Sequence, residues 1–208
     1  MDPTLWLGFA IASTVLLVMP GPTILLVLSY ALTQGRRVAV ASALGVAFGD
    51  LIAMTVSIIG LGAVFLASAT AFSVLKWAGA LYLLWLGVKM LRSAGSEPML
   101  TRKPEGASAG KVFRDLSLVT ALNPKSNTFF IAFVPQFIDP NAAFAPQAII
   151  MIATFVGIAG LNALAFALAA NAMRSRITRP SIQAWMSRVG GITLIGMGLM
   201  TATLRRAT

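Results

Sequence analysis

The chain contains no cysteine and no histidine, and only six of its 208 residues are acidic. The absence of cysteine excludes disulfides, thiol redox chemistry and thiolate metal sites. Without histidine, a metal site would need carboxylates, amides and carbonyls, and the carboxylates are scarce. We therefore expect no metal and no cofactor. Cysteine can act as a nucleophile and histidine can activate one, and the chain has neither, so an enzyme is the least favoured class of protein.

Apolar residues dominate what is present. Hydrophobic residues make up 58% of the chain, charged residues 11%, and the mean hydropathy is +0.86. One water-soluble core of ordinary size cannot bury that share, so we predict an integral membrane protein with the lipid bilayer as its solvent. The first apolar stretch follows Asp2 rather than a basic residue and is longer than a signal-peptide core. We expect it to be a retained span.

Six apolar stretches are long enough to cross roughly 30 Å of hydrocarbon. They cover approximately residues 4–33, 38–67, 70–92, 114–138, 146–173 and 180–204. Only a short Ala/Ser/Thr turn separates the second from the third, so five spans is the main competing count. The polar segment 93–113 is the predicted cytoplasmic linker between two three-span halves, 1–92 and 114–208.

Basic residues collect in cytoplasmic loops, and here they are unequally shared between the two sides. One side receives Arg36, Arg37, Lys89, Arg92, Arg102, Lys103, Lys111, Arg114, Arg174, Arg176, Arg179 and Arg188, and the other only Lys76, Arg205 and Arg206. Six spans then place both termini outside the cell and the linker in the cytoplasm. Because these residues form short runs between apolar stretches, the net charge of +10 does not indicate a nucleic-acid partner.

Proline interrupts the first span of each half. Pro20-Gly21-Pro22 breaks the first span and Asn123-Pro124-Lys125 breaks the fourth. With three spans per half, the second half enters the membrane with opposite polarity. The predicted fold class is therefore all-α, with six transmembrane helices in two inverted three-helix repeats, the first helix of each half being broken at proline.

The breaks share their depth with polar residues of other spans. A rise of 1.5 Å per residue places Pro22, Asp50, Lys125 and Asn162 about 16 to 18 Å from the ends of their spans, near the midplane. Irregular backbone at such depth normally lines a cavity, because freed carbonyls need partners. A simple packing kink is the alternative. We predict a substrate- or proton-binding site formed by Pro20, Gly21, Pro22, Asp50, Asn123, Pro124, Lys125 and Asn162.

Asp50 and Lys125 are the two ionisable residues well inside predicted spans, where function is the default hypothesis. Asp50 has three candidate roles: proton carrier, ligand for a substrate ammonium group, or partner of Lys125 in a structural ion pair. Lys125 has two: receiving a carboxylate, or extending its stem toward the membrane surface. Gly45 and Gly49 favour close helix packing, either within the monomer or across a possible homodimer.

Several motifs together resemble the LysE/RhtB family of bacterial amino-acid exporters along nearly the whole chain. They are Pro20-Gly21-Pro22, the segment Gly45-x-x-x-Gly49-Asp50, the run 76–83 followed by Gly87, Asn123-Pro124-Lys125 with Phe129-Phe130, and Phe133-x-Pro135-Gln136-Phe137.

The resemblance implies a multi-pass protein of the bacterial inner (cytoplasmic) membrane, so that the outer side, with both termini, is the periplasm. It also implies proton-driven antiport that exports amino acids or close derivatives through alternating access of two related halves. With a single buried acid evident, we expect neutral substrates such as homoserine, threonine or leucine. Two rival functions stay open: a cation or metal-ion exporter on a similar scaffold, and a membrane interaction protein with no transport cycle.

Overall fold

The computed structural model describes residues 1–19, 21–67, 69–92, 106–139, 141–177 and 179–203, and all their regular elements are helical. The α-helices are α1 (Pro3–Val18), α2 (Pro22–Gln34), α3 (Ala39–Ala67), α4 (Ala69–Arg92), α5 (Ala109–Ala121), α6 (Pro124–Ala132), α7 (Phe144–Ile177) and α8 (Pro180–Thr203). Two short 3₁₀ helices, η1 (Gly35–Val38) and η2 (Val134–Phe137), join them.

The helix breaks predicted from proline are confirmed. α1 ends at Val18 and α2 begins at Pro22, and α5 ends at Ala121 before α6 begins at Pro124. Proline suits the first position of a helix because the N–H it lacks would have no partner there. α3 ends at Ala67 and α4 begins at Ala69, on either side of residue 68, which lies outside the described residues.

α5 begins at Ala109, inside the segment assigned to the linker and before the fourth predicted span. Ser108 caps it by accepting a hydrogen bond from the Lys111 N–H at 3.3 Å. Hydropathy does not locate this start, because Gly110 and Lys111 stand in the first turn. Residues 93–105 of the linker lie outside the described residues.

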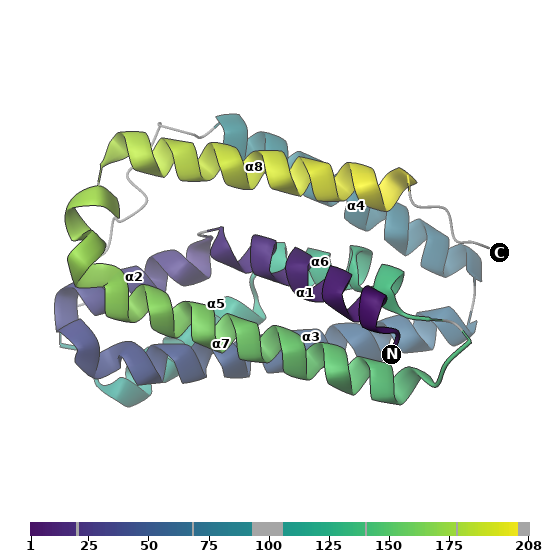
Figure 1. Cartoon of the computed structure of the whole chain (residues 1–208), viewed down its shortest axis with the longest axis horizontal. Helices are drawn as coiled ribbons and strands as arrows, with labels where there is room; N and C mark the ends of the chain where they lie inside the picture. Colours follow the sequence, from purple (N-terminus) through teal and green to yellow (C-terminus); the bar gives the residue numbers. More distant parts are fainter. Residues whose placement is uncertain (20, 68, 93–105, 140, 178, 204–208) are drawn as a thin grey trace.

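The long helices run back and forth along one axis (Figure 1). α2 continues the direction of α1, and the chain then reverses at η1, where Gly35 has a φ of 68° that favours glycine. α1 begins and α8 ends at the same end of the bundle. η1, the end of α4, the start of α5 and the α7–α8 junction lie toward the opposite end.

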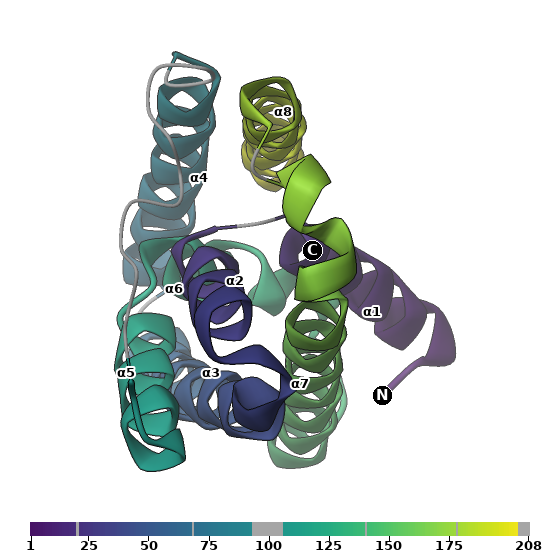
Figure 2. The same ribbon diagram turned by 90° about the vertical axis from the view of Figure 1, so that its left-hand side faces the viewer.

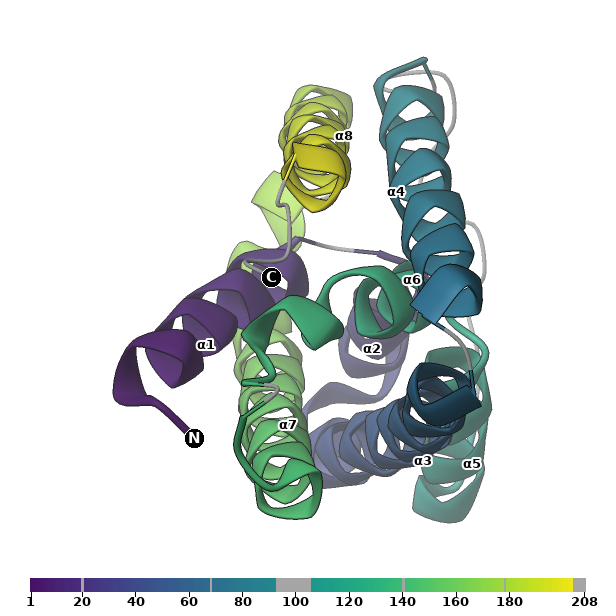
Figure 3. The ribbon, with the colours of Figure 1, turned by 90° about the vertical axis from the view of Figure 1, so that its right-hand side faces the viewer.

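The two short half-helices α2 and α6 occupy the middle of the bundle. The end-on views place them among α1, α3, α5 and α7, with α4 and α8 together on one side (Figures 2 and 3). In agreement, α2 packs against α7 and α5, and α6 packs against α4 and α3. The part of each broken span that follows its break, α2 or α6, therefore lies in the interior of the bundle.

Glycines allow the closest helix contacts. A Cβ on Gly45 would lie 2.7 Å from the Phe113 carbonyl oxygen, and one on Gly49 only 2.6 Å from that of Ser117, so these two glycines bring α3 against α5. Likewise, a Cβ on Gly87 would lie 2.6 Å from the Gly191 oxygen, between α4 and α8. The Gly45/Gly49 pair is thus used inside the monomer.

Apolar side chains cover the outside as well as filling the core. Leu7, Ile11, Val56 and Ile59 are exposed by 53–66%, as expected where lipid replaces water. Two helical stretches, Pro22–Gly60 and Phe144–Ala170, meet length and hydropathy criteria for crossing a membrane. The first of these includes the reversal at η1.

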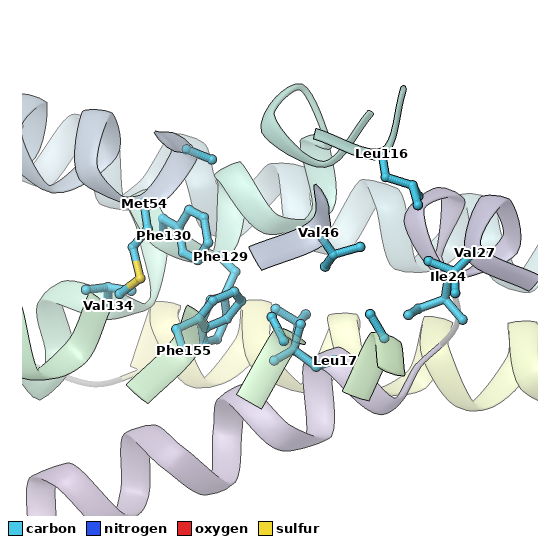
Figure 4. Packing of buried hydrophobic residues seen from close by; sticks show 14 of the residues in the cluster. Leu17, Ile24, Val27, Val46, Met54, Leu116, Phe129, Phe130, Val134 and Phe155 are labelled. Carbon is cyan, nitrogen blue, oxygen red and sulfur yellow. The ribbon is translucent and has the colours of Figure 1, made fainter. Parts of the chain in front are cut away.

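The core is rich in phenylalanine toward one end of the bundle and aliphatic toward the other (Figure 4). Phe129, Phe130 and Phe155 pack near Met54 and Val134, whereas Val27 and Leu116 lie toward the other end (Figure 4). Rings of the first group make close contacts, with 4.8 Å between the centroids of Phe130 and Phe155. Between the two regions lie Leu17 and Val46, which line the cavity described below together with Ile24, beside Val27.

A glycine exchange tests the α3–α5 contact. Gly49→Ala places a methyl group against the Ser117 oxygen, and we expect overpacking to destabilise the protein by about 1–3 kcal/mol. Gly60→Ala on the same helix meets nothing within 4 Å, and its higher helix propensity should leave stability equal or up to about 1 kcal/mol higher. Thermal unfolding in detergent measures both. Equal midpoints for the two variants would contradict the close packing.

Candidate functional site

The first break leaves carbonyl groups of α1 without their helical partners. A proline at position 20 has no N–H for the Leu16 oxygen, and Pro22 has none for the Val18 oxygen. Pro20 itself lies outside the described residues. Unpaired carbonyls in a buried region cost stability, so other groups must reach the end of α1.

Lys125 of α6 supplies two of these bonds across the interior. Its Nζ donates to the carbonyl oxygens of Leu16 and Met19, each at 2.8 Å, and the residue is only 7% exposed. A cation at this position also complements the negative end of the α1 dipole. The Lys125 stem passes close to Gly21. A Cβ built on Gly21 would lie 3.6 Å from the lysine Cδ, an ordinary van der Waals contact.

Asn162 of α7 supplies a further bond to the same helix end. Its Nδ2 donates to the Leu17 carbonyl oxygen at 2.9 Å. The broken end of α1 is therefore held by side chains from two helices of the second half.

The second break is held in a related way. Asn123 caps α6 by accepting from the Lys125 backbone N–H at 3.1 Å, and its Nδ2 donates to Thr23 Oγ1 at 3.1 Å. Thr120 also donates to Thr23 Oγ1, at 3.4 Å. Asn127 donates to the Ala121 oxygen at the end of α5. Thr23 on α2 thus contacts the break in the second half, as Lys125 on α6 contacts the break in the first.

Asp50 of α3 is buried, at 1% exposed, and its Oδ1 has no hydrogen-bond partner. Although Asp50 and Lys125 both belong to the described part of the chain and line one cavity, no direct ion pair joins them. Lys125 instead bonds backbone oxygens. A buried carboxylate without a partner is costly and marks a place where a proton or a cation is expected.

These groups surround a small cavity of about 20 Å³, room for one water molecule. Its lining comprises Leu17, Gly21, Thr23, Ile24, Val46, Asp50, Thr120, Asn123, Lys125, Ser126, Ala159 and Asn162. Of the predicted site residues, the structure brings Gly21, Asp50, Asn123, Lys125 and Asn162 together.

Pro22 and Pro124 do not line the cavity. Each begins a helix, α2 or α6, and each side chain is exposed. Sequence reasoning missed Thr23 and Thr120, which each lie within three residues of a break. That proximity is the signal that could have found them.

The two sides of the first break offer opposite partial charges. α1 ends in carbonyl oxygens, which are partially negative. Gly21, the N-cap of α2, provides no side-chain cap, so the first free N–H groups of α2 can receive an anion. Within the described residues, no group of three His, Cys, Asp or Glu side chains could hold a metal ion. The arrangement is suited to reversible binding of charged or polar groups.

Comparison with known proteins agrees with this membrane setting. The chain is 32% identical over 202 residues to a homoserine/homoserine lactone efflux protein of Salmonella typhimurium, covering 97% of this chain and 98% of the relative. It is 31% identical over 205 residues to an uncharacterized membrane protein of Vibrio cholerae, covering 99% and 100%. No solved structure matches. The sequence model of the LysE type translocators matches residues 14–204, and the chain belongs to this family of membrane transport proteins.

Proposed function

We propose that the protein exports small neutral amino acids or close derivatives, such as homoserine, across the cytoplasmic membrane in exchange for protons. The observation that carries the proposal is the broken end of α1 beside a buried, unpartnered carboxylate, with the uncapped start of α2 opposite. The family and the efflux relatives favour export of this substrate class.

The first break matches the head group of an α-amino acid. Carbonyl oxygens ending one helix attract an ammonium group, and free N–H groups starting the next attract a carboxylate. Half-helix ends serve this purpose in other transporters. The relative from Salmonella typhimurium is named for homoserine and its lactone. A lactone keeps the ammonium group but has no free carboxylate, so the ammonium end should be the main anchor.

Asp50 is the proposed proton carrier. Its free Oδ1 can hold a proton when no substrate is present and can face an ammonium group when one is. Binding of the two is then mutually exclusive, which is the requirement for antiport. The other buried ionisable group near the cavity, Lys125, is engaged with the end of α1.

The cavity must widen to take an amino acid, because a volume of about 20 Å³ has room for about one water molecule. Toward the end that carries η1, the Tyr30 hydroxyl donates to Asp115 Oδ2 at 2.7 Å, linking α2 to α5. Toward the other end, the Phe9 ring lies 5.7 Å from that of Phe137. Transport requires these contacts to open in turn.

Helix packing supports the two inverted halves. α3 packs against α7 and α4 against α8, which are equivalent helices in such a repeat. The contact of α5 with α3 has its counterpart in α1 with α7, and that of α6 with α3 in α2 with α7. α6 also packs against α4, while α2 makes no comparable contact with α8 in the described residues. In alternating access the two halves differ in conformation at any one time, and the different contacts of α6 and α2 agree with this.

The proposed orientation places η1 and the start of α5 in the cytoplasm, and both termini in the periplasm. Arg36 and Arg37 lie in η1, and Lys111 and Arg114 lie near the start of α5, in keeping with the distribution of basic residues in membrane proteins.

The homodimer that the sequence suggested as a possible use of Gly45 and Gly49 stays a prediction.

Substitution of Asp50 tests the coupling. Proteoliposomes with an acidic interior should accumulate labelled homoserine, and Asp50→Asn should reduce the initial rate at least about tenfold because the side chain can no longer exchange a proton. Asp139→Asn is the control, since Asp139 lies outside the cavity lining. Unchanged uptake by Asp50→Asn would remove the coupling role. Uptake of labelled inorganic cations but of no amino acid would favour the cation exporter.

Thiol labelling tests the orientation in a chain that has no native cysteine. Gly110→Cys in α5 and Asn141→Cys before α7 introduce exposed thiols. A membrane-impermeant maleimide should label Asn141→Cys in intact cells and Gly110→Cys only after the inner membrane is permeabilised. The reverse pattern would contradict the proposed orientation, and labelling of both in intact cells would contradict the six-span count.

A further inference from the structure

The partners of the Lys125 ammonium group are unusual for a buried cation. A carboxylate would be its ordinary partner, and Asp50 lines the same cavity with one oxygen free. The Nζ instead bonds the Leu16 and Met19 oxygens. The end of α1 is therefore a site that already holds a primary ammonium group, supplied by the protein itself.

We propose that these two carbonyl oxygens form a binding site for a primary ammonium group, with the Asp50 carboxyl in the lining of the same cavity, and that Lys125 fills this site until a ligand's ammonium group takes it over. The inference rests on the proposed function for the identity of the ligand, an amino acid or a related primary amine. The site itself follows from the contacts of Lys125.

Three features make the site independent of Lys125. The prolines at positions 20 and 22 ensure that no helical N–H takes the place of the lysine at the end of α1. The helix dipole favours any cation there. The free Oδ1 of Asp50, 1% exposed, can accept one more N–H from a ligand. An ammonium group has three N–H donors: two match the Leu16 and Met19 oxygens, as those of Lys125 do, and the third is left for the cavity that Asp50 also lines.

Displacement gives Lys125 a role in the cycle. Once Asp50 has given up its proton, Asp50 and Lys125 carry opposite charges, and an amino acid zwitterion adds one more of each sign. After exchange, the ligand's ammonium group faces Asp50 and the end of α1, while the released Lys125 can pair with the ligand's carboxylate. Every charge then has a partner, which limits the cost of burying them. Release of α1 by Lys125 also removes two of the hydrogen bonds that join the two halves, while those of Asn162 and Thr23 remain.

Ethylammonium, which has no carboxylate, tests the site in the full-length protein in nanodiscs. In Lys125→Ala the site is vacated, so we expect ethylammonium to bind at least about tenfold more tightly than to the wild type, where it must displace two hydrogen bonds to a charged group. Lys111→Ala should behave like the wild type. Tetramethylammonium has the same charge and no N–H donor, and should bind Lys125→Ala at least about tenfold more weakly than ethylammonium. Isothermal titration calorimetry measures each affinity.

Equal affinity of Lys125→Ala for the two cations would overturn the proposal. If that variant does not fold, the wild type decides: homoserine should bind at least about tenfold more tightly than its N,N,N-trimethyl derivative, and equal binding would overturn the proposal. The proposed function fails separately, if wild-type proteoliposomes take up no amino acid while Lys125→Ala still selects ethylammonium.

Discussion

The bonds from Lys125 to the end of α1 are the interaction on which the site depends. Proline removes the N–H groups that would continue the first helix, and a lysine from the other half of the chain replaces them at 2.8 Å. These bonds, together with that from Asn162, hold the break, and they connect α6 to α1. The Lys125 amine is thereby bonded to backbone oxygens rather than paired with Asp50, whose Oδ1 has no hydrogen-bond partner.

Reciprocity between the halves extends this account. Lys125 follows the proline that starts α6, and Thr23 follows the proline that starts α2. Each side chain reaches the break in the opposite half, one with a charge and the other with a hydroxyl. A substrate that enters between the breaks must therefore disturb contacts between halves. Binding and movement of the halves are linked through the same few hydrogen bonds.

Sequence was sufficient for what depends on local chemistry. Proline located both breaks, and the rarity of charge in apolar spans pointed to Asp50 and Lys125. It was insufficient where backbone atoms act: the acceptors of Lys125 are carbonyl oxygens, which every residue has. It also missed Thr23 and Thr120, since hydroxyls are common in membrane helices. The start of α5 lies before the fourth predicted span, because a serine caps the helix there and hydropathy does not register a cap.

A crystal structure of the protein with homoserine bound would test the central claim most directly. The account predicts the ligand's ammonium nitrogen within hydrogen-bond distance, about 2.7–3.2 Å, of the Leu16 and Met19 carbonyl oxygens, with the Lys125 amine moved off them. Homoserine bound elsewhere, with Lys125 still bonded to the end of α1, would contradict it.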